Sequence, residues 1–171
     1  MKQQSIVSGL GGQGALTLTR LLAEAAFAGG LEVITSETHG MAQRGGAVIS
    51  MIKVGPFKGP LIPAGAADLG LFLHRDSLPV HRFYLKPGGA VFIDASIPGD
   101  YFNIDARGLA AQMGLASVTA NLILLGYAVG QGALFCGPDL LEQVITAKTP
   151  ARFREANLQA FRVGLETAER K

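Results

Sequence analysis

The chain has 171 residues, the length of one domain, and residues 1–171 are expected to fold as a single unit. A formal net charge of +2, without a run of lysine or arginine, argues against a nucleic-acid partner. Charged residues make up only 16% of the chain, against about 25% in an average soluble domain. Such a shortage is expected of a surface that another protein covers.

The cysteine content and the hydropathy exclude further classes. A single cysteine, Cys136, permits no disulfide within the chain and is too few for an iron–sulfur cluster, so any redox metal belongs to another chain and no metal site is expected here. The apolar residues 115–135 are interrupted by polar residues and glycines, which indicates a buried helix rather than a membrane span. Because the N-terminus does not resemble a secretory signal, the sequence predicts a cytoplasmic protein without a membrane partner.

The apolar pattern predicts alternating strands and helices in the first half of the chain. The expected strands are residues 4–8, 31–35, 47–54, 68–73 and 90–94. One helix begins at Ala15, and a second, short helix is expected to take Ser77 as its N-terminal cap. The remaining expected helices are residues 109–113, 118–130, 139–147 and 151–169. The predicted fold class is therefore α/β: a Rossmann-like, mostly parallel sheet flanked by helices, with a helical C-terminal part.

A glycine loop lies between the first strand and the first helix. Gly9, Gly11 and Gly14 match G-x-G-x-x-G in the position that dinucleotide-binding loops occupy. Glycines let the backbone approach a phosphate, and a helix N-terminus supplies unpaired N–H groups. Glu37, 23 residues after Gly14, stands where an acidic residue can bind a ribose. A free-standing NAD-binding domain is one interpretation, and a regulatory or scaffold protein whose glycines only allow close packing is another.

A second polar segment, SETHGMAQRGG at residues 36–46, has neither a helical nor a strand period and predicts a loop. Thr38 and His39 can hydrogen-bond an oxygen of a ligand, and Arg44 can bind a carboxylate or phosphate through two hydrogen bonds. Alternatively, His39 is an exposed turn residue and Arg44 pairs with Glu37 or Glu32 on the surface.

Together these segments resemble a known family. GLGGQG at residues 9–14 and SETHGMAQRGGAV at residues 36–48 are similar to the small, gamma-type subunit of 2-oxoacid:ferredoxin oxidoreductases, and most of all to the beta subunit of the indolepyruvate type. The similarity covers nearly the whole chain and includes LKPGG at residues 85–89, Asn121, and NLQAF at residues 157–161. It departs at His74 and Arg75, where the family pattern leads us to expect an acidic residue.

The resemblance implies a subunit that cannot work alone. Such complexes decarboxylate a 2-oxoacid on thiamine diphosphate, pass electrons through iron–sulfur clusters to ferredoxin, and transfer the acyl group to coenzyme A. The large partner subunit is expected to carry thiamine diphosphate, magnesium and the 4Fe-4S clusters. No cofactor is expected on this chain alone, and coenzyme A is a candidate for contacts with both chains.

The resemblance also implies site residues, with His39 as the candidate for proton transfer. The residues expected to contact a cofactor or substrate are Gly11, Gly12, Gln13, Gly14, Thr38, His39, Arg44 and Gly45. An isolated chain can also form a homodimer through the surface that its partner covers.

Overall fold

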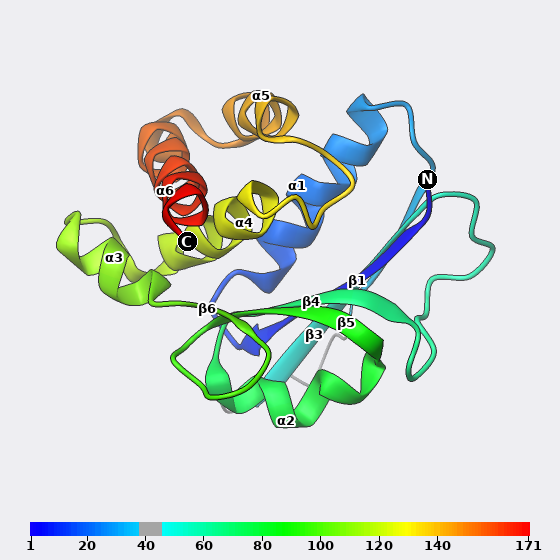
Figure 1. Ribbon diagram of the computed structural model, residues 1–171. Coiled ribbons are helices and arrows are strands. Elements are labelled where there is room, and N and C mark those ends of the chain that lie inside the picture. Colours follow the sequence, from blue (N-terminus) through cyan, green and yellow to red (C-terminus); the bar gives the residue numbers. More distant parts are fainter. Residues whose placement is uncertain (38–45) are drawn as a thin grey trace.

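A six-stranded sheet runs through the computed structural model, which describes residues 1–37 and 46–171 (Figure 1). Its order is β2-β3-β1-β4-β5-β6. The strands are β1 (Gln3–Leu10), β2 (Val33–Glu37), β3 (Ala47–Val54), β4 (Ala67–Phe72), β5 (Leu85–Asp94) and β6 (Phe102–Ile104). Pairing is parallel from β1 through β4 and β5 to β6, whereas β3 is antiparallel to both of its neighbours. The predicted mostly parallel sheet is confirmed.

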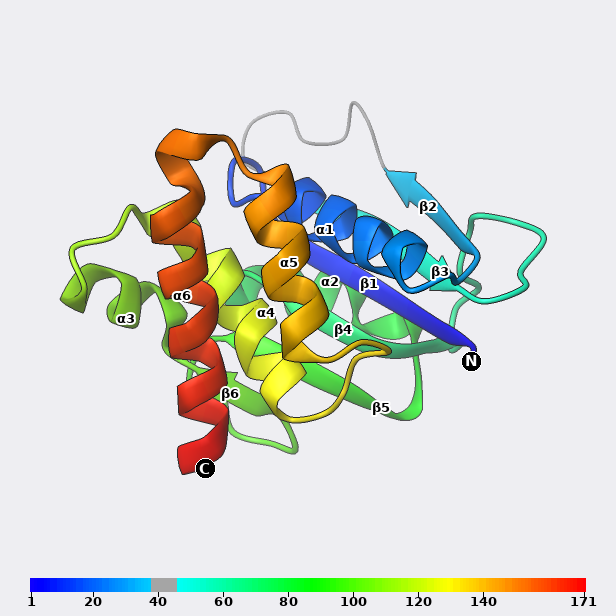
Figure 2. The same ribbon diagram turned by 90° about the horizontal axis from the view of Figure 1, so that it is seen from above.

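Helices cover the two faces of the sheet unequally. The longer helices lie together on one face, as Figures 1 and 2 show. These are α1 (Ala15–Ala28), α4 (Ala120–Gly130), α5 (Pro138–Lys148) and α6 (Ala151–Arg170). Of the helices in the described residues, the opposite face carries only α2 (Leu78–His81), between 3₁₀ turns at Arg75–Ser77 and Arg82–Tyr84. Beyond the end of β5 lies α3 (Ala106–Gln112), and a 3₁₀ turn at Ser117–Thr119 leads into α4.

Strand alternation divides the apolar residues between two cores. Neighbouring residues of a strand point to opposite faces, so Val7 packs toward α1 and α4 while Ile6 packs toward α2. Every residue of α4 from Ala120 to Val129 is buried, because this helix lies between the sheet and α6. A helix buried all round needs no polar face, which explains the apolar segment in the sequence. No helix in the described part of the chain is long and apolar enough to cross a membrane.

Three local features differ from the expectations. Ser77 stands at the N-terminal cap of α2 as predicted, but its side chain makes no capping hydrogen bond; the His74 side chain accepts one at the 3₁₀ turn before α2. The segment LKPGG belongs to β5 instead of forming a turn; Pro87 is tolerated there because pairing with β4 is irregular at this point and β6 pairs only with residues 92–94. Finally, β6 was missed, since three residues carry too short a pattern to read.

The arrangement of the strands creates a crevice at one edge. From β1 the chain continues to β2, toward one edge of the sheet, and from β4 it continues to β5, toward the opposite edge. In open α/β sheets, ligands bind where neighbouring strands diverge in this way, at their carboxyl ends. The glycine loop follows β1 at this point.

Candidate functional site at the glycine loop

The glycine loop, residues 11–14, joins β1 to α1 in a conformation that only glycine adopts easily. Gly12 and Gly14 both have a φ of 84°, in the left-handed region. The side chain of Gln13 folds back, and its Oε1 accepts a hydrogen bond of 2.7 Å from the backbone N–H of Leu10. The glutamine therefore braces the loop, and its side-chain oxygen is occupied within the chain.

Asn121, in the first turn of α4, holds the loop from the other side. Its Nδ2 donates to the carbonyl oxygen of Gly14 at 3.3 Å, and a Cβ on Gly14 would collide with that nitrogen. Asn121 is only 4% exposed, yet its Oδ1 has no hydrogen-bond partner among the residues that the structure describes. An acceptor left unpaired in the interior costs about 1–3 kcal/mol, so it is a feature that a ligand can relieve.

Two cavities flank the loop. The first has a volume of about 450 Å³ and lies between the loop, the start of α1 and the ends of β2 and β3. No described side chain caps α1, and its first turn holds no acidic residue. The N–H groups at the start of this helix are thus not capped by a described side chain, and the helix dipole contributes positive potential to the cavity.

The second cavity, of about 320 Å³, lies on the other side of the loop at the crevice between β1 and β4. Gly12, Gln13 and Asn121 line it together with Asp94 and Arg107. The last two were not among the predicted site residues. A signal for one of them was present, because Asp94 is the last residue of a predicted buried strand, at the edge of the sheet where ligands bind.

Asp94 and Arg107 form an ion pair at the end of β5. Asp94 is 3% exposed; its Oδ1 accepts a hydrogen bond of 2.8 Å from the backbone N–H of Ala106, and its Oδ2 lies 3.3 Å from Nε of Arg107. Burial raises the pKa of the Asp94 carboxyl above its ordinary value, although the backbone N–H groups and the Arg107 charge act in the opposite direction. The carboxylate anchors both the start of α3 and the Arg107 guanidinium.

The predicted site residues fall into two groups. Gly11, Gly12, Gln13 and Gly14 lie together at this edge. Thr38, His39, Arg44 and Gly45 lie outside the described residues, so their roles stay predictions. Glu37, the last residue of β2, and the first residues of β3 line the first cavity.

The NAD-binding interpretation meets a topological difference. In dinucleotide-binding folds the second strand of the chain is the direct neighbour of the first, which brings its terminal acid to the ribose. Here β3 lies between β1 and β2, so Glu37 is displaced by one more strand, a spacing of about 4.8 Å. The order of the strands therefore departs from that of the competing class.

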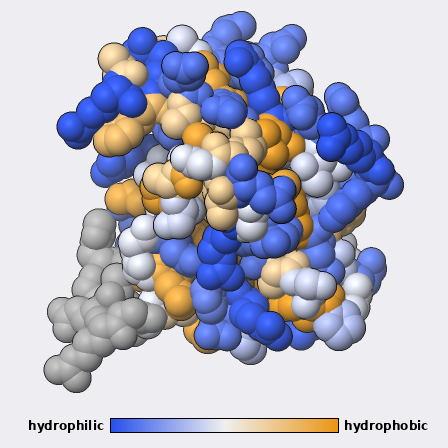
Figure 3. Space-filling view, turned by 90° about the vertical axis from the view of Figure 1, so that its left-hand side faces the viewer, coloured by the Kyte–Doolittle hydropathy of each residue, from blue (hydrophilic) through white to orange (hydrophobic). Residues whose placement is uncertain are grey.

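Figure 3 looks onto the side of the molecule at which β1 and its parallel neighbours end. Hydrophilic and hydrophobic side chains are interspersed over this face rather than gathered in one apolar patch. A partner or ligand that binds here meets a mixed surface, which is typical of interfaces that also hold a polar site.

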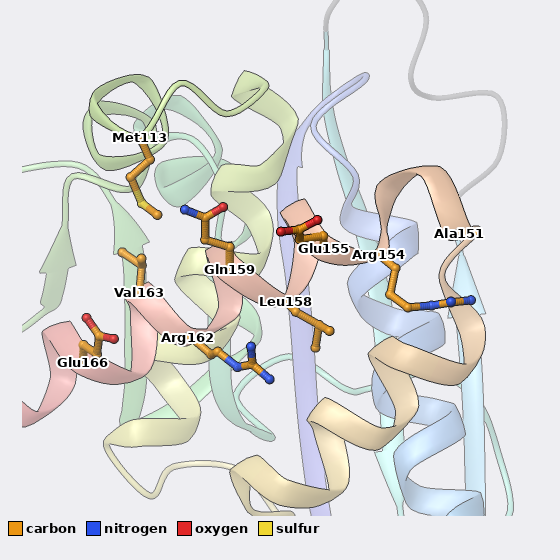
Figure 4. A pocket seen from close by; sticks show the side chains of 9 residues that line it. All are labelled: Met113, Ala151, Arg154, Glu155, Leu158, Gln159, Arg162, Val163 and Glu166. Carbon is orange, nitrogen blue, oxygen red and sulfur yellow. The ribbon is translucent and has the colours of Figure 1, made fainter.

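A larger cavity of about 640 Å³ runs along α6 and contains none of the predicted site residues. In Figure 4, Gln159 and Val163 lie toward Met113, whereas Arg162 turns the other way. Arg162 pairs with Glu142 of α5, and Arg154 donates to the carbonyl oxygen of Thr149. Both arginines of this cavity therefore have a partner within the chain, although the buried Nε of Arg154 has none among the described residues, and the side chains do not converge on a common point. The glycine-loop edge is the better candidate site.

Comparison with known proteins agrees with the fold. The pyruvate ferredoxin/flavodoxin oxidoreductase family matches residues 4–167. The chain is 31% identical to the indolepyruvate oxidoreductase subunit IorB of Archaeoglobus fulgidus, over 98% of this chain and 96% of that protein. It is also 31% identical to IorB of Thermococcus kodakarensis, over 99% of this chain and 98% of that protein.

A solved structure supports the same relationship. The gamma subunit of the keto/oxoacid ferredoxin oxidoreductase of Geobacter sulfurreducens superposes with a TM-score of 0.81 at 26% identity, over 99% of both chains. The chain belongs to the pyruvate ferredoxin/flavodoxin oxidoreductase family. Within that family it is a small, gamma-type subunit of a 2-oxoacid:ferredoxin oxidoreductase, and the resemblance found in its sequence is confirmed.

Proposed function

We propose that this chain is the small subunit of an indolepyruvate-type ferredoxin oxidoreductase, and that its glycine-loop edge forms one wall of an active site completed by a large partner subunit. The similarity to two IorB subunits over nearly their whole length supports the substrate class. The observation that carries the site is the uncapped start of α1, which opens beside Gly12 and Gly14 into a cavity of about 450 Å³.

The electron-transfer groups are assigned to the partner because the donor set of this chain does not suit them. A 4Fe-4S cluster takes four thiolates, but the chain has one cysteine, and burial raises the pKa of the Cys136 thiol to about 11. No described group of three His, Cys, Asp or Glu side chains is placed to hold a metal ion. In this proposal the large subunit carries thiamine diphosphate, magnesium and the clusters, and it delivers electrons to ferredoxin.

The edge does fit a phosphorylated ligand such as coenzyme A. It offers backbone N–H groups at the start of α1, an arginine, and an amide oxygen on Asn121 that has no partner in the described part of the chain. When bound, coenzyme A supplies the thiol that accepts the acyl group. The residues of this chain bind and orient: the N–H groups of α1 donate to anionic or carbonyl oxygens, and Gln13 keeps the loop in the shape that presents them.

The first experiment is co-expression with the large subunit, native purification, and ferredoxin reduction with indolepyruvate, pyruvate and 2-oxoisovalerate. We expect a stable complex with an iron–sulfur absorbance and a preference for indolepyruvate. A chain that binds no large partner but saturates with NAD would replace the proposal by the NAD-binding interpretation. A preference for another 2-oxoacid would leave the subunit assignment intact and correct the substrate.

A matched pair of variants tests the loop itself. Gly12 and Gly30 both have positive φ, at 84° and 74°, and a Cβ on either would meet no atom within 4 Å. Alanine at each position should therefore cause similar backbone strain, on the order of 1–2 kcal/mol. Because Gly12 faces the cavity and Gly30 lies past the far end of α1, Gly12→Ala should lower ferredoxin reduction while Gly30→Ala should not. Equal activity in the two variants would contradict a role for the loop.

A further inference from the structure

The second cavity, at the crevice between β1 and β4, has the features of a separate ligand subsite. The charged side chains among its lining residues are Asp94 and Arg107, brought next to the glycine loop from the end of β5 and the start of α3. Both oxygens of Asp94 are engaged, one with backbone N–H groups and the other with Nε of Arg107. The carboxylate is therefore directed at the start of α3 and away from an incoming ligand.

Arg107 keeps donors to spare. A guanidinium has five N–H groups. Among the described residues, this one contacts Asp94, through the ion pair that its Nε makes. The side chain is 47% exposed and lines the cavity, and no other contact of its guanidinium with a described residue is seen. Pairing through Nε fixes the orientation of the planar group, and an oriented guanidinium binds a carboxylate or phosphate through two parallel hydrogen bonds.

Asn121 provides an independent observation on the same cavity. This residue is only 4% exposed and lines the cavity, and its Oδ1 lacks a partner among the described residues. Its orientation is set by the bond from Nδ2 to Gly14, so the oxygen cannot be exchanged for the nitrogen without loss of that bond. The cavity thus combines an anion-binding donor with an acceptor that needs an N–H or O–H group.

We propose that Arg107, positioned by Asp94, binds an anionic group of the ligand in this cavity, and that Asn121 Oδ1 accepts a hydrogen bond from a donor on the same molecule. The inference rests on the proposed function for the identity of the ligand. Two anionic groups among the reactants can bind to Arg107 in this way, namely the phosphates of coenzyme A and the carboxylate of the 2-oxoacid.

The test is calorimetric binding to the purified complex, which does not depend on turnover. The probes are coenzyme A, the phosphate-free analogue pantetheine, and indolepyruvate, each with the wild-type complex and with Arg107→Gln. Since a hydrogen bond to a charged group contributes about 1.5–3 kcal/mol, the variant should bind the relevant anion about 10- to 100-fold more weakly. A loss for coenzyme A but not for pantetheine identifies phosphate, and a loss for indolepyruvate identifies the carboxylate.

Arg162→Gln is the matched control, because Arg162 is 55% exposed and paired with the carboxylate of Glu142, and neither residue lines this cavity. It should bind all three probes as the wild type does. Arg107→Lys keeps the charge but not the planar fork, so it should fall between wild type and Arg107→Gln. Thermal unfolding of each complex shows that it is folded.

Unchanged binding of both anions by a folded Arg107→Gln complex would overturn the inference. A complex that shows no oxidoreductase activity on any 2-oxoacid, but binds coenzyme A in an Arg107-dependent way, would refute the proposed function and leave the subsite standing. Weakened binding that Arg162→Gln reproduces would indicate a general effect of surface charge and would also count against the subsite.

Discussion

Substitution of Gly164 by alanine tests a helix contact on which the layer above the sheet depends. At the crossing of α4 and α6, Gly126 and Gly164 allow the two backbones to approach. A Cβ on Gly164 would overlap the carbonyl oxygen of Ile123 and lie 2.7 Å from the backbone nitrogen of Tyr127. A Cβ on Gly126 would overlap the carbonyl oxygen of Phe161. The obstruction is backbone in both cases, so no side chain can rotate away to relieve it.

The expected cost follows from how far the helices must separate. A Cβ does not come within 3.0 Å of backbone, so α6 has to move by about 1 Å, and a gap of that size forfeits a quarter to a half of the local van der Waals attraction. Overpacking adds about 1–3 kcal/mol, whereas alanine gains about 1 kcal/mol in helix propensity. Because the obstruction is backbone, we take the upper end of that range, and the net loss is then about 2 kcal/mol in the free energy of unfolding, equivalent to a melting temperature about 4–8 °C lower.

Urea and thermal unfolding of Gly164→Ala measure this loss, with Gly59→Ala as the control. A Cβ on Gly59 would meet nothing within 4 Å, and its φ is not positive, so that variant should differ little from wild type. The double variant at Gly126 and Gly164 should lose less than the sum of the two single losses, since one separation relieves both clashes. A Gly164→Ala protein as stable as the control would refute the backbone contact between α4 and α6.

Three further predictions concern titrating groups. Burial lowers the pKa of His81, whose Nδ1 lies 2.6 Å from Ser8 Oγ. As the pH falls, the histidine of the unfolded chain is therefore protonated before that of the folded chain, and the free energy of unfolding should fall below about pH 6.5. This decrease should be smaller in His81→Gln. Burial raises the pKa of Asp94, so the contribution of this residue to stability should decline as the pH rises from 3.8 through the pKa of the folded protein. Urea unfolding of Asp94→Asn at several pH values should not show this decline. The same decline in the variant would contradict a raised pKa for Asp94. With a thiol pKa of about 11, Cys136 should react with iodoacetamide near pH 8 on the order of 100-fold more slowly than a free thiol, and a similar rate would show that the thiol is not desolvated.

The sequence was sufficient for elements whose cause is local. The start of the helix at Ala15 and both bounds of the strand at residues 47–54 were predicted correctly. The apolar period and the glycines that end an element depend on residues that are neighbours in the chain. The failures were local patterns that tertiary pairing overrode. LKPGG has the composition of a turn, yet β4 pairs with this segment and draws it into β5.

The candidate site shows the same division. Residues 11–14 were recognisable from sequence because left-handed backbone and close approach select glycine within a single loop. Asn121, Asp94 and Arg107 gave no joint signal, since they lie some 80–110 residues from the loop and meet it only when β5, α3 and α4 pack together. Composition and local motifs thus determined the family and the loop. The tertiary structure alone decided that β3 separates β1 from β2 and that a buried carboxylate orients an arginine beside the loop, because both depend on pairing between segments far apart in the chain.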